Sequence, residues 1–257
     1  MADKTNSADT LKAILVLLAT IGTIAFNVLA ANGFVNGVTP EAISDRYPTV
    51  LTPAGYAFSI WSLIYAGTLA FSVYQLLPAN RSKFRSIRSA YIASSVLNCL
   101  WIYFWHHDLI AVCLAVILGL LGTLIFICRS LIRTESPGEL WAAKAPFGLY
   151  AGWVTCATII NFLVLLIYLR VDLTADLRNS LGAALILLAA GIAVLARVYL
   201  KNYFYPLAVA WALTAIAVKQ SGNTPIVVAA AVGVIASLIT SLSFVVTLPL
   251  SQDRAAS

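Results

Sequence analysis

Eight long runs of apolar residues constrain this chain more than any other feature. A helix needs about 20 apolar residues to cross the hydrocarbon core of a bilayer. The runs predict spanning helices at 11–31, 55–77, 89–105, 109–132, 145–169, 179–199, 202–218 and 225–248. They are too long for the strands of a membrane β-barrel, which have about ten residues of alternating polarity. We therefore predict an all-α integral membrane protein with eight transmembrane helices.

The composition of the chain supports this class. Of 257 residues, 61% are hydrophobic and only 10% are charged, whereas soluble domains have about 45–50% and about 25%. A soluble protein could not cover its surface with so few polar groups, and disorder, coiled coil and a disulfide scaffold are excluded. The four cysteines all lie within apolar runs and have no metal-ligand spacing, which favours small buried side chains; they are Cys99, Cys113, Cys128 and Cys156.

Charge indicates topology rather than nucleic-acid binding. The net charge is +6, and the basic residues stand between the apolar runs, where they contact membrane lipids. Arg46, Arg170, Arg178 and Lys219 fall on one set of alternate loops, and the other 12 of the 16 Lys and Arg residues fall on the opposite set. Positively charged loops face the cytoplasm, so we expect both termini to be cytoplasmic and the longest loop, 32–54, to face outward.

The first run also admits a second interpretation. Lys4 and Lys12 precede it, and Val28–Ala30 resembles the small-residue cleavage site of a signal peptide. Its length favours a retained membrane helix. The charge bias, together with the absence of an evident transit peptide, predicts a bacterial inner (plasma) membrane.

Polar and aromatic residues share helical faces in four of the spans. In 89–105, Ser94, Asn98, Trp101 and Trp105 have the i, i+4, i+7, i+11 spacing of one stripe. The other stripes are Thr20, Thr23 and Asn27; Ala57, Trp61, Tyr65 and Thr68; and Tyr150, Trp153, Ala157 and Asn161. Two interpretations stay open: hydrogen bonding and packing between helices, or an aromatic-walled pocket with a few polar anchors.

Shorter patterns give further expectations. Gly148 and Gly152 form a GxxxG motif opposite the Trp153 stripe, which favours contact with another helix of the same chain and leaves a homo-oligomer open. Thr39-Pro40-Glu41 is typical of a capped helix start and predicts a short lid helix.

The turn between the third and fourth spans contains the only histidines. His106 and His107 are expected to lie in a solvated turn, with Asp108 as N-cap of the following helix. No paired carboxylates, nucleophile with base or metal-ligand cluster occurs within the spans, so we predict no catalytic and no metal-binding residues.

Three stretches carry a resemblance to a known family. The run Trp153–Asn161 reads WVTCATIIN, with Tyr150 ahead of it, and Leu97–Trp101 reads LNCLW. Pro53 precedes a Trp61-x-x-x-Tyr65 pattern. In this order and spacing they resemble the tryptophan-rich sensory protein family, also called the translocator protein family. The resemblance covers 11–170 as a five-helix unit, and 171–248 is interpreted as a three-helix C-terminal extension.

The resemblance implies a sensory membrane protein that binds a tetrapyrrole, haem or protoporphyrin, as a ligand and not as a required cofactor. It implies a pocket between the helices, covered by the first loop. With Asn27 from the first stripe, the candidate ligand-binding residues are Asn27, Pro53, Trp61, Tyr65, Asn98, Trp101, Trp105, Tyr150, Trp153 and Asn161. The alternatives are a transporter of hydrophobic or amphipathic small molecules and a light-dependent porphyrin-degrading protein.

The chain departs from the family pattern in the first loop. The family's W-x-P-P signature is reduced to Leu51-Thr52-Pro53, and Gly55 stands where the family has a loop tryptophan. This departure puts porphyrin chemistry that needs a loop tryptophan in doubt, so binding is the expected activity.

Overall fold

The structure, a computed structural model, describes residues 7–133 and 136–247. Within these ranges the chain is helical and contains no β-strand. The elements are α1 (Ser7–Ala31), α2 (Pro40–Arg46), the 3-10 helix η1 (Gly55–Ser59), α3 (Ile60–Tyr74), α4 (Arg85–His106), α5 (Ile110–Ser130), α6 (Pro137–Glu139), the π-helical η2 (Leu140–Lys144), α7 (Ala145–Tyr168), α8 (Ala175–Tyr199), α9 (Phe204–Lys219) and α10 (Thr224–Thr247).

Each predicted span corresponds to one long helix, but not every helix has the length and composition of a membrane span. Six stretches of the described residues do: those containing α1, α3, α5, α7, α8 and α10. Helix α9 has only 16 residues, and α4 carries Arg85, Arg88 and a stripe of polar side chains. The all-helical membrane fold is therefore confirmed, while the count of eight spans stays a prediction.

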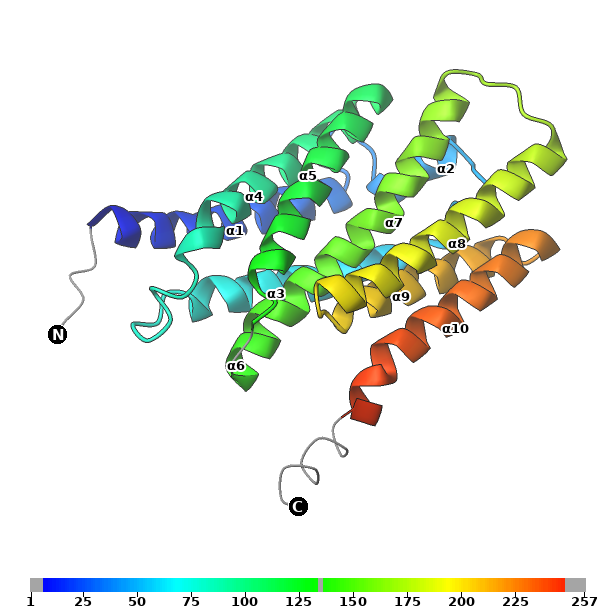
Figure 1. Cartoon of the computed structure of the whole chain (residues 1–257). Coiled ribbons are helices and arrows are strands. Elements are labelled where there is room, and N and C mark those ends of the chain that lie inside the picture. Colours follow the sequence, from blue (N-terminus) through cyan, green and yellow to red (C-terminus); the bar gives the residue numbers. More distant parts are fainter. Residues whose placement is uncertain (1–6, 134–135, 248–257) are drawn as a thin grey trace, which may run out of the picture.

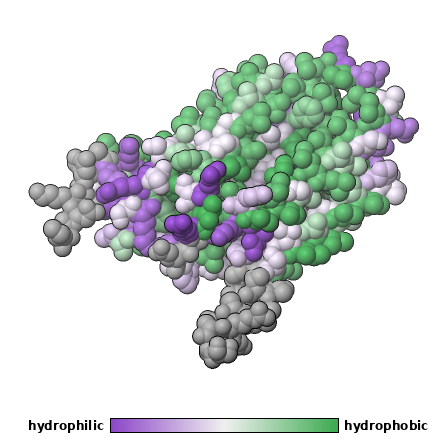
Figure 2. Space-filling model, in the orientation of Figure 1, coloured by the Kyte–Doolittle hydropathy of each residue, from purple (hydrophilic) through white to green (hydrophobic). Residues whose placement is uncertain are grey.

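Successive long helices run in opposite directions (Figure 1). The start of α1 meets the start of α4 through an ion pair between Asp9 and Arg88. Helix α2 lies at the other end of the bundle, next to the end of α4. Arg46, Arg170, Arg178 and Lys219 all lie at or beyond helix ends on the α2 side. Figure 2 shows apolar side chains over most of the visible face, with hydrophilic residues gathered towards the two ends.

Helix α7 is the central element of the bundle. In its most apolar stretch 61% of the residues are buried, against 33% in each of the other five candidate spans. It packs against α3 and α5 on one side and α9 on the other, and α9 is in turn covered by α8 and α10. One continuous core therefore joins residues from both predicted units, from Val16 in α1 to Ala230 in α10.

The GxxxG motif contacts a helix of the same chain, as expected. A Cβ atom at Gly148 would overlap the side chain of Asn202, and one at Gly152 would overlap the backbone carbonyl oxygen of Tyr205. The amide of Asn202 donates to the Lys144 carbonyl oxygen (2.9 Å) and accepts from the Phe204 amide (2.9 Å). The two glycines thus let α9 begin directly against the backbone of α7.

Two expectations for the turn after α4 are wrong. His106 is the last residue of α4 and is fully buried, with Nδ1 lying 2.7 Å from the Ile102 carbonyl oxygen. The helix continues to this residue, and its carbonyl accepts a hydrogen bond from the Asn36 side chain (2.6 Å), which covers the turn. Asp108 does not cap α5: it has a positive φ of 55°, and its carboxylate is used by α2 instead. His107 is exposed, as expected.

Candidate ligand site

Four tryptophans from three helices meet near the α2 end of the bundle. Trp101 and Trp105 of α4 stack with ring centroids 5.7 Å apart, and Trp61 of α3 meets Trp101 edge-on at 6.4 Å. Phe58 of η1 connects Trp61 at 5.5 Å to Trp153 of α7 at 6.1 Å. Aromatic pairs favour such edge-on and offset arrangements, so the predicted stripes on separate helices form one cluster.

Buried amides and hydroxyls fix the helices around this cluster. Asn27 of α1 donates to Asn98 of α4 (2.7 Å), and Asn98 donates to the hydroxyl of Tyr150 of α7 (2.7 Å). The amide of Asn161 bonds its own helix at the Ala157 carbonyl oxygen (2.9 Å). The hydrogen bonds from Asn27 through Asn98 to Tyr150 connect three helices. This agrees with the interpretation that the polar residues of the stripes form contacts between helices.

The four indole N–H groups differ in their partners. Trp101 donates to the amide oxygen of Asn161 (3.2 Å), and Trp105 donates to the carbonyl oxygen of Pro40 (3.2 Å). Within the described part of the chain, the N–H groups of Trp61 and Trp153 donate to no protein acceptor. Trp61 and Trp153 therefore line the same cavities, and neither indole N–H has a protein acceptor among the described residues.

Three adjoining cavities surround Trp61. The one between the four tryptophans has a volume of about 40 Å³, a deeper one by Tyr150 about 20 Å³, and one beneath the start of α2 about 240 Å³. All ten predicted site residues line at least one of the three; they are Asn27, Pro53, Trp61, Tyr65, Asn98, Trp101, Trp105, Tyr150, Trp153 and Asn161. Whether these residues bind a ligand stays a prediction.

Several residues that line these cavities are not among the ten predicted ones. Phe58, Ala157 and Ile160 complete the walls of the cavity between the four tryptophans, and Ser44 of α2 also lines it. Phe58 precedes Trp61 by three residues and so shares its helical face, which is a signal the sequence contains. Ser44 comes from a loop helix, and no periodicity links it to the spans.

Helix α2 forms the lid over the aromatic cluster. It begins as predicted, with the Thr39 hydroxyl accepting from the Ala42 amide (3.2 Å) and Pro40 in its first turn. Two ion pairs tie its far end to neighbouring elements: Arg46 with Asp108 (3.3 Å) and Lys219 of α9 with Asp45 (3.2 Å).

Tyr47 adds a further tie where the lid ends. Its hydroxyl donates to Asp108 (3.1 Å). Burial, and then the adjacent Asp108 carboxylate, raise the pKa of Tyr47, which keeps the hydroxyl protonated and able to donate. The lid is therefore closed in this structure by one indole, one phenol and two ion pairs.

Gly55, where the chain departs from the family pattern, lies against the lid. A Cβ atom at Gly55 would overlap the carboxyl group of Glu41, the second residue of α2. The Glu41 side chain lies where a side chain at position 55 would begin, so a larger residue at this position would require the exposed carboxyl group of Glu41 to turn aside.

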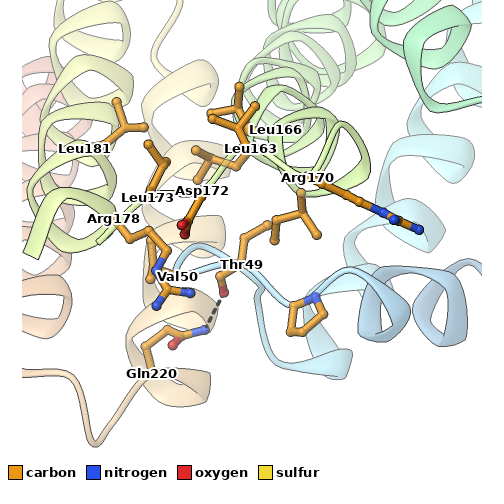
Figure 3. Close-up of a pocket in the computed structure, with 13 residues that line it drawn as sticks. Thr49, Val50, Leu163, Leu166, Arg170, Asp172, Leu173, Arg178, Leu181 and Gln220 are labelled. Atoms are coloured by element: carbon orange, nitrogen blue, oxygen red, sulfur yellow. Dashed lines mark hydrogen bonds between the residues drawn. The ribbon is translucent and has the colours of Figure 1, made fainter. Parts of the chain in front are cut away.

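A second and larger cavity lies outside the aromatic cluster. It has a volume of about 670 Å³ and is formed by the end of α7, the start of α8, the end of α9 and the segment 48–50 (Figure 3). It contains none of the ten predicted residues, because its walls come from separate stretches that share no stripe or motif. We place the candidate site at the smaller cavity, where the aromatic and free polar groups converge.

Comparison with known proteins gives one match. A family model described as TSPO-like protein matches residues 13–244. No curated protein and no solved structure matches the chain. The matched range extends through α8, α9 and most of α10, and so crosses the predicted boundary at 170. The division into a five-helix and a three-helix unit stays a prediction.

Proposed function

The chain belongs to the TSPO-like protein family, and on this premise we propose that it is a sensory protein that binds a tetrapyrrole, haem or protoporphyrin, between its helices. It is an integral membrane protein that contacts lipids. The ligand is planar and largely apolar, and it carries acceptor groups at its edge. Such a molecule can stack on indole rings and accept hydrogen bonds from them.

The observation that carries the proposal is the pair of free donors at Trp61 and Trp153. Tryptophan N–H groups that are buried usually find a partner, and Trp101 and Trp105 have theirs within the protein. Trp153 is only 6% exposed, and its side chain faces the cavity shared with Trp61. A ligand with carboxylate acceptors at its edge supplies the partners that the protein does not.

Binding requires the lid to open. Pockets for ligands of this class enclose roughly 300–1,000 Å³, whereas the cavity between the four tryptophans has about 40 Å³. The larger space of about 240 Å³ lies directly beneath α2. Displacement of α2 joins these spaces, and the resulting change in the loop is the signal that a sensory protein would transmit.

The proposed location is the inner membrane of a bacterium, with both termini in the cytoplasm. The bias of 12 basic residues against four supports this orientation. Helix α2 lies at the end of the bundle that has the four basic residues. The lid therefore faces outward, and the ligand enters from the outer side or from the outer leaflet.

The test is a titration of the purified chain in detergent with protoporphyrin and with haemin. Binding is measured as the shift of the absorption bands of these ligands. Absorbance of the ligand does not depend on which tryptophan has been replaced. We expect saturable binding, and about tenfold weaker binding for Trp153→Phe, which keeps a ring but loses the donor, a change worth about 1.4 kcal/mol.

Two further variants control this test. Trp141→Phe alters a tryptophan that is 65% exposed at the other end of the bundle, and its affinity should equal that of the wild type. Ala157→Phe fills the aromatic cavity and should abolish binding. Absence of saturable binding by folded wild-type protein, or equal affinity in all variants, would refute the tetrapyrrole site.

A further inference from the structure

We propose that the large cavity between α7, α8 and the segment 48–50 binds one phospholipid whose headgroup carries a phosphate and a primary ammonium group. This site is separate from the aromatic cluster, so the proposal stands or fails independently of tetrapyrrole binding. It rests on the apolar walls of the cavity, on its two charged groups and on its position at the helix ends.

The walls of the cavity are apolar on the side towards the bundle. Leu163, Leu166 and Ile167 come from the last two turns of α7, and Leu181 comes from the second turn of α8. Ile167 and Val171 are exposed beside the opening, with Tyr168 and Leu169 exposed next to them. The cavity therefore opens through an apolar margin of the kind that acyl chains contact.

The cavity is also lined by one positive and one negative group. The guanidinium of Arg178 turns towards Gln220 and Thr49, and the carboxylate of Asp172 points to the same part of the cavity (Figure 3). Among the described residues, neither charged group has a hydrogen-bond or ion-pair partner. Gln220 is held in place by its own bonds to the carbonyl oxygens of Thr49 (3.1 Å) and Thr52 (3.3 Å).

Arg170 also borders the cavity, but its side chain points away from it (Figure 3). The charges that face a ligand are therefore one cation and one anion. A purely anionic headgroup would be attracted by Arg178 and repelled by Asp172. A headgroup with a phosphate and an ammonium satisfies both, since guanidinium binds phosphate and carboxylate accepts from ammonium.

The position of the cavity fits a lipid rather than a soluble metabolite. Arg170 to Leu173 lie in the connection between the end of α7 at Tyr168 and the start of α8 at Ala175. The charged groups are thus at the helix ends, where headgroups lie, and Leu163 is about 7.5 Å deeper along α7, at the level of the upper acyl chains. The volume of about 670 Å³ is large enough for a headgroup with the adjoining chain segments.

The experiment measures lipid retention by the full chain in detergent, using native mass spectrometry. The lipids have identical acyl chains and the headgroups phosphoethanolamine, phosphocholine and phosphoglycerol. We expect one phosphatidylethanolamine to be retained in preference to the other two, because a quaternary ammonium cannot donate a hydrogen bond to Asp172 and phosphoglycerol has no ammonium.

Two variants separate the roles of the charged groups. Arg178→Gln should weaken retention of all three lipids about tenfold, since the phosphate is common to them. Asp172→Asn should abolish the preference for phosphatidylethanolamine and should retain phosphatidylglycerol more strongly than the wild type does. Arg170→Gln is the matched control, because it removes an arginine beside the same cavity whose side chain points away from the ligand. Lipid retention by this variant should equal that of the wild type.

Several results would overturn the proposal. Equal retention by Arg178→Gln and wild type, or an unchanged headgroup preference in Asp172→Asn, would show that the two groups do not bind the lipid. Competition by free phosphoethanolamine at the same concentration as the lipid would show a headgroup site without a role for the apolar walls. Thermal unfolding midpoints of all variants verify that each is folded.

Discussion

Four tryptophans line the aromatic cavity, and hydrogen bonding divides them into two pairs. Trp101 and Trp105 donate to Asn161 and to Pro40, and so hold α4 against α7 and the lid. Trp61 and Trp153 keep their donors free. At the residue scale, the stripes therefore fit both interpretations. Two of the tryptophans form hydrogen bonds between elements, and the other two line a cavity with their N–H groups free of protein acceptors among the described residues.

Gly152 gives a prediction at the residue scale. Gly152→Val places a side chain against the carbonyl oxygen of Tyr205, which belongs to the backbone and cannot turn aside. We expect a loss of about 1–3 kcal/mol in the free energy of unfolding, measured as a lower thermal midpoint in detergent. Gly191→Ala is the control, since nothing lies within 4 Å of a Cβ there; a helical alanine should leave the midpoint equal or higher. Equal midpoints for both variants would contradict the close contact between α7 and α9.

Helix α2 is the element that controls access to the aromatic cavity. Both of its ion pairs are between side chains that are roughly half exposed. Such pairs contribute only about 0–1 kcal/mol and are screened by salt. The two ion pairs are therefore weak ties at the end of the lid, which is also held by the buried side chain of Ile43 and by the hydrogen bonds of Trp105 and Tyr47.

The ion pairs lead to a prediction about the rate of ligand association. Replacing both acceptors, Asp45→Asn with Asp108→Asn, should raise the association rate of protoporphyrin about fivefold, as expected for the loss of about 1 kcal/mol. The wild-type rate should rise with salt, and the rate of the double variant should not. Asp176→Asn is the control for charge alone: it removes a carboxylate at the same end of the bundle that forms no ion pair with the described residues of α2. A rate in the double variant no higher than in this control would show that the ion pairs do not hold the lid.

At the scale of the whole molecule, the last three helices are part of the same packing unit as the first five. Helix α9 covers the glycine face of α7, and its Trp211 donates to the carbonyl oxygen of Ala57 (3.0 Å). The Ala215 carbonyl oxygen accepts from the Ala54 amide (3.0 Å), and Gln220 binds Thr49. The segment that leads into η1, and with it Pro53 and Phe58, is thus anchored on α9.

This arrangement predicts the result of a truncation. A chain that ends at Arg170 should not form a stable, monodisperse particle, because the face of α7 around Gly152 would be left uncovered and Ala54 and Ala57 would lose their hydrogen-bond partners on α9. Size-exclusion chromatography and thermal unfolding in detergent measure this outcome. If the truncated chain instead folds with the same stability and binds the same ligand, the five-helix unit predicted from the sequence is an independent domain.

What the sequence by itself determined was the class of the protein, the location of its long helices and the residues that share a helical face. These properties depend on the length of apolar runs and on a period of 3.6 residues, which are local and can be read along the chain. The stripes that contain Trp61, Trp101 and Trp153 do meet, since semi-polar faces have no other place than the interior of a bundle in lipid.

Only the tertiary structure decided what depends on segments far apart in the chain. His106 is buried where Asn36 of the first loop bonds the end of α4, and Asp108 contacts α2 instead of capping α5. The large cavity combines Val50, Leu166, Arg178 and Gln220, which no periodicity connects. A local pattern shows which face of a helix is turned inward, but which other helix meets that face, and where a space remains between them, is set by the packing of the whole chain.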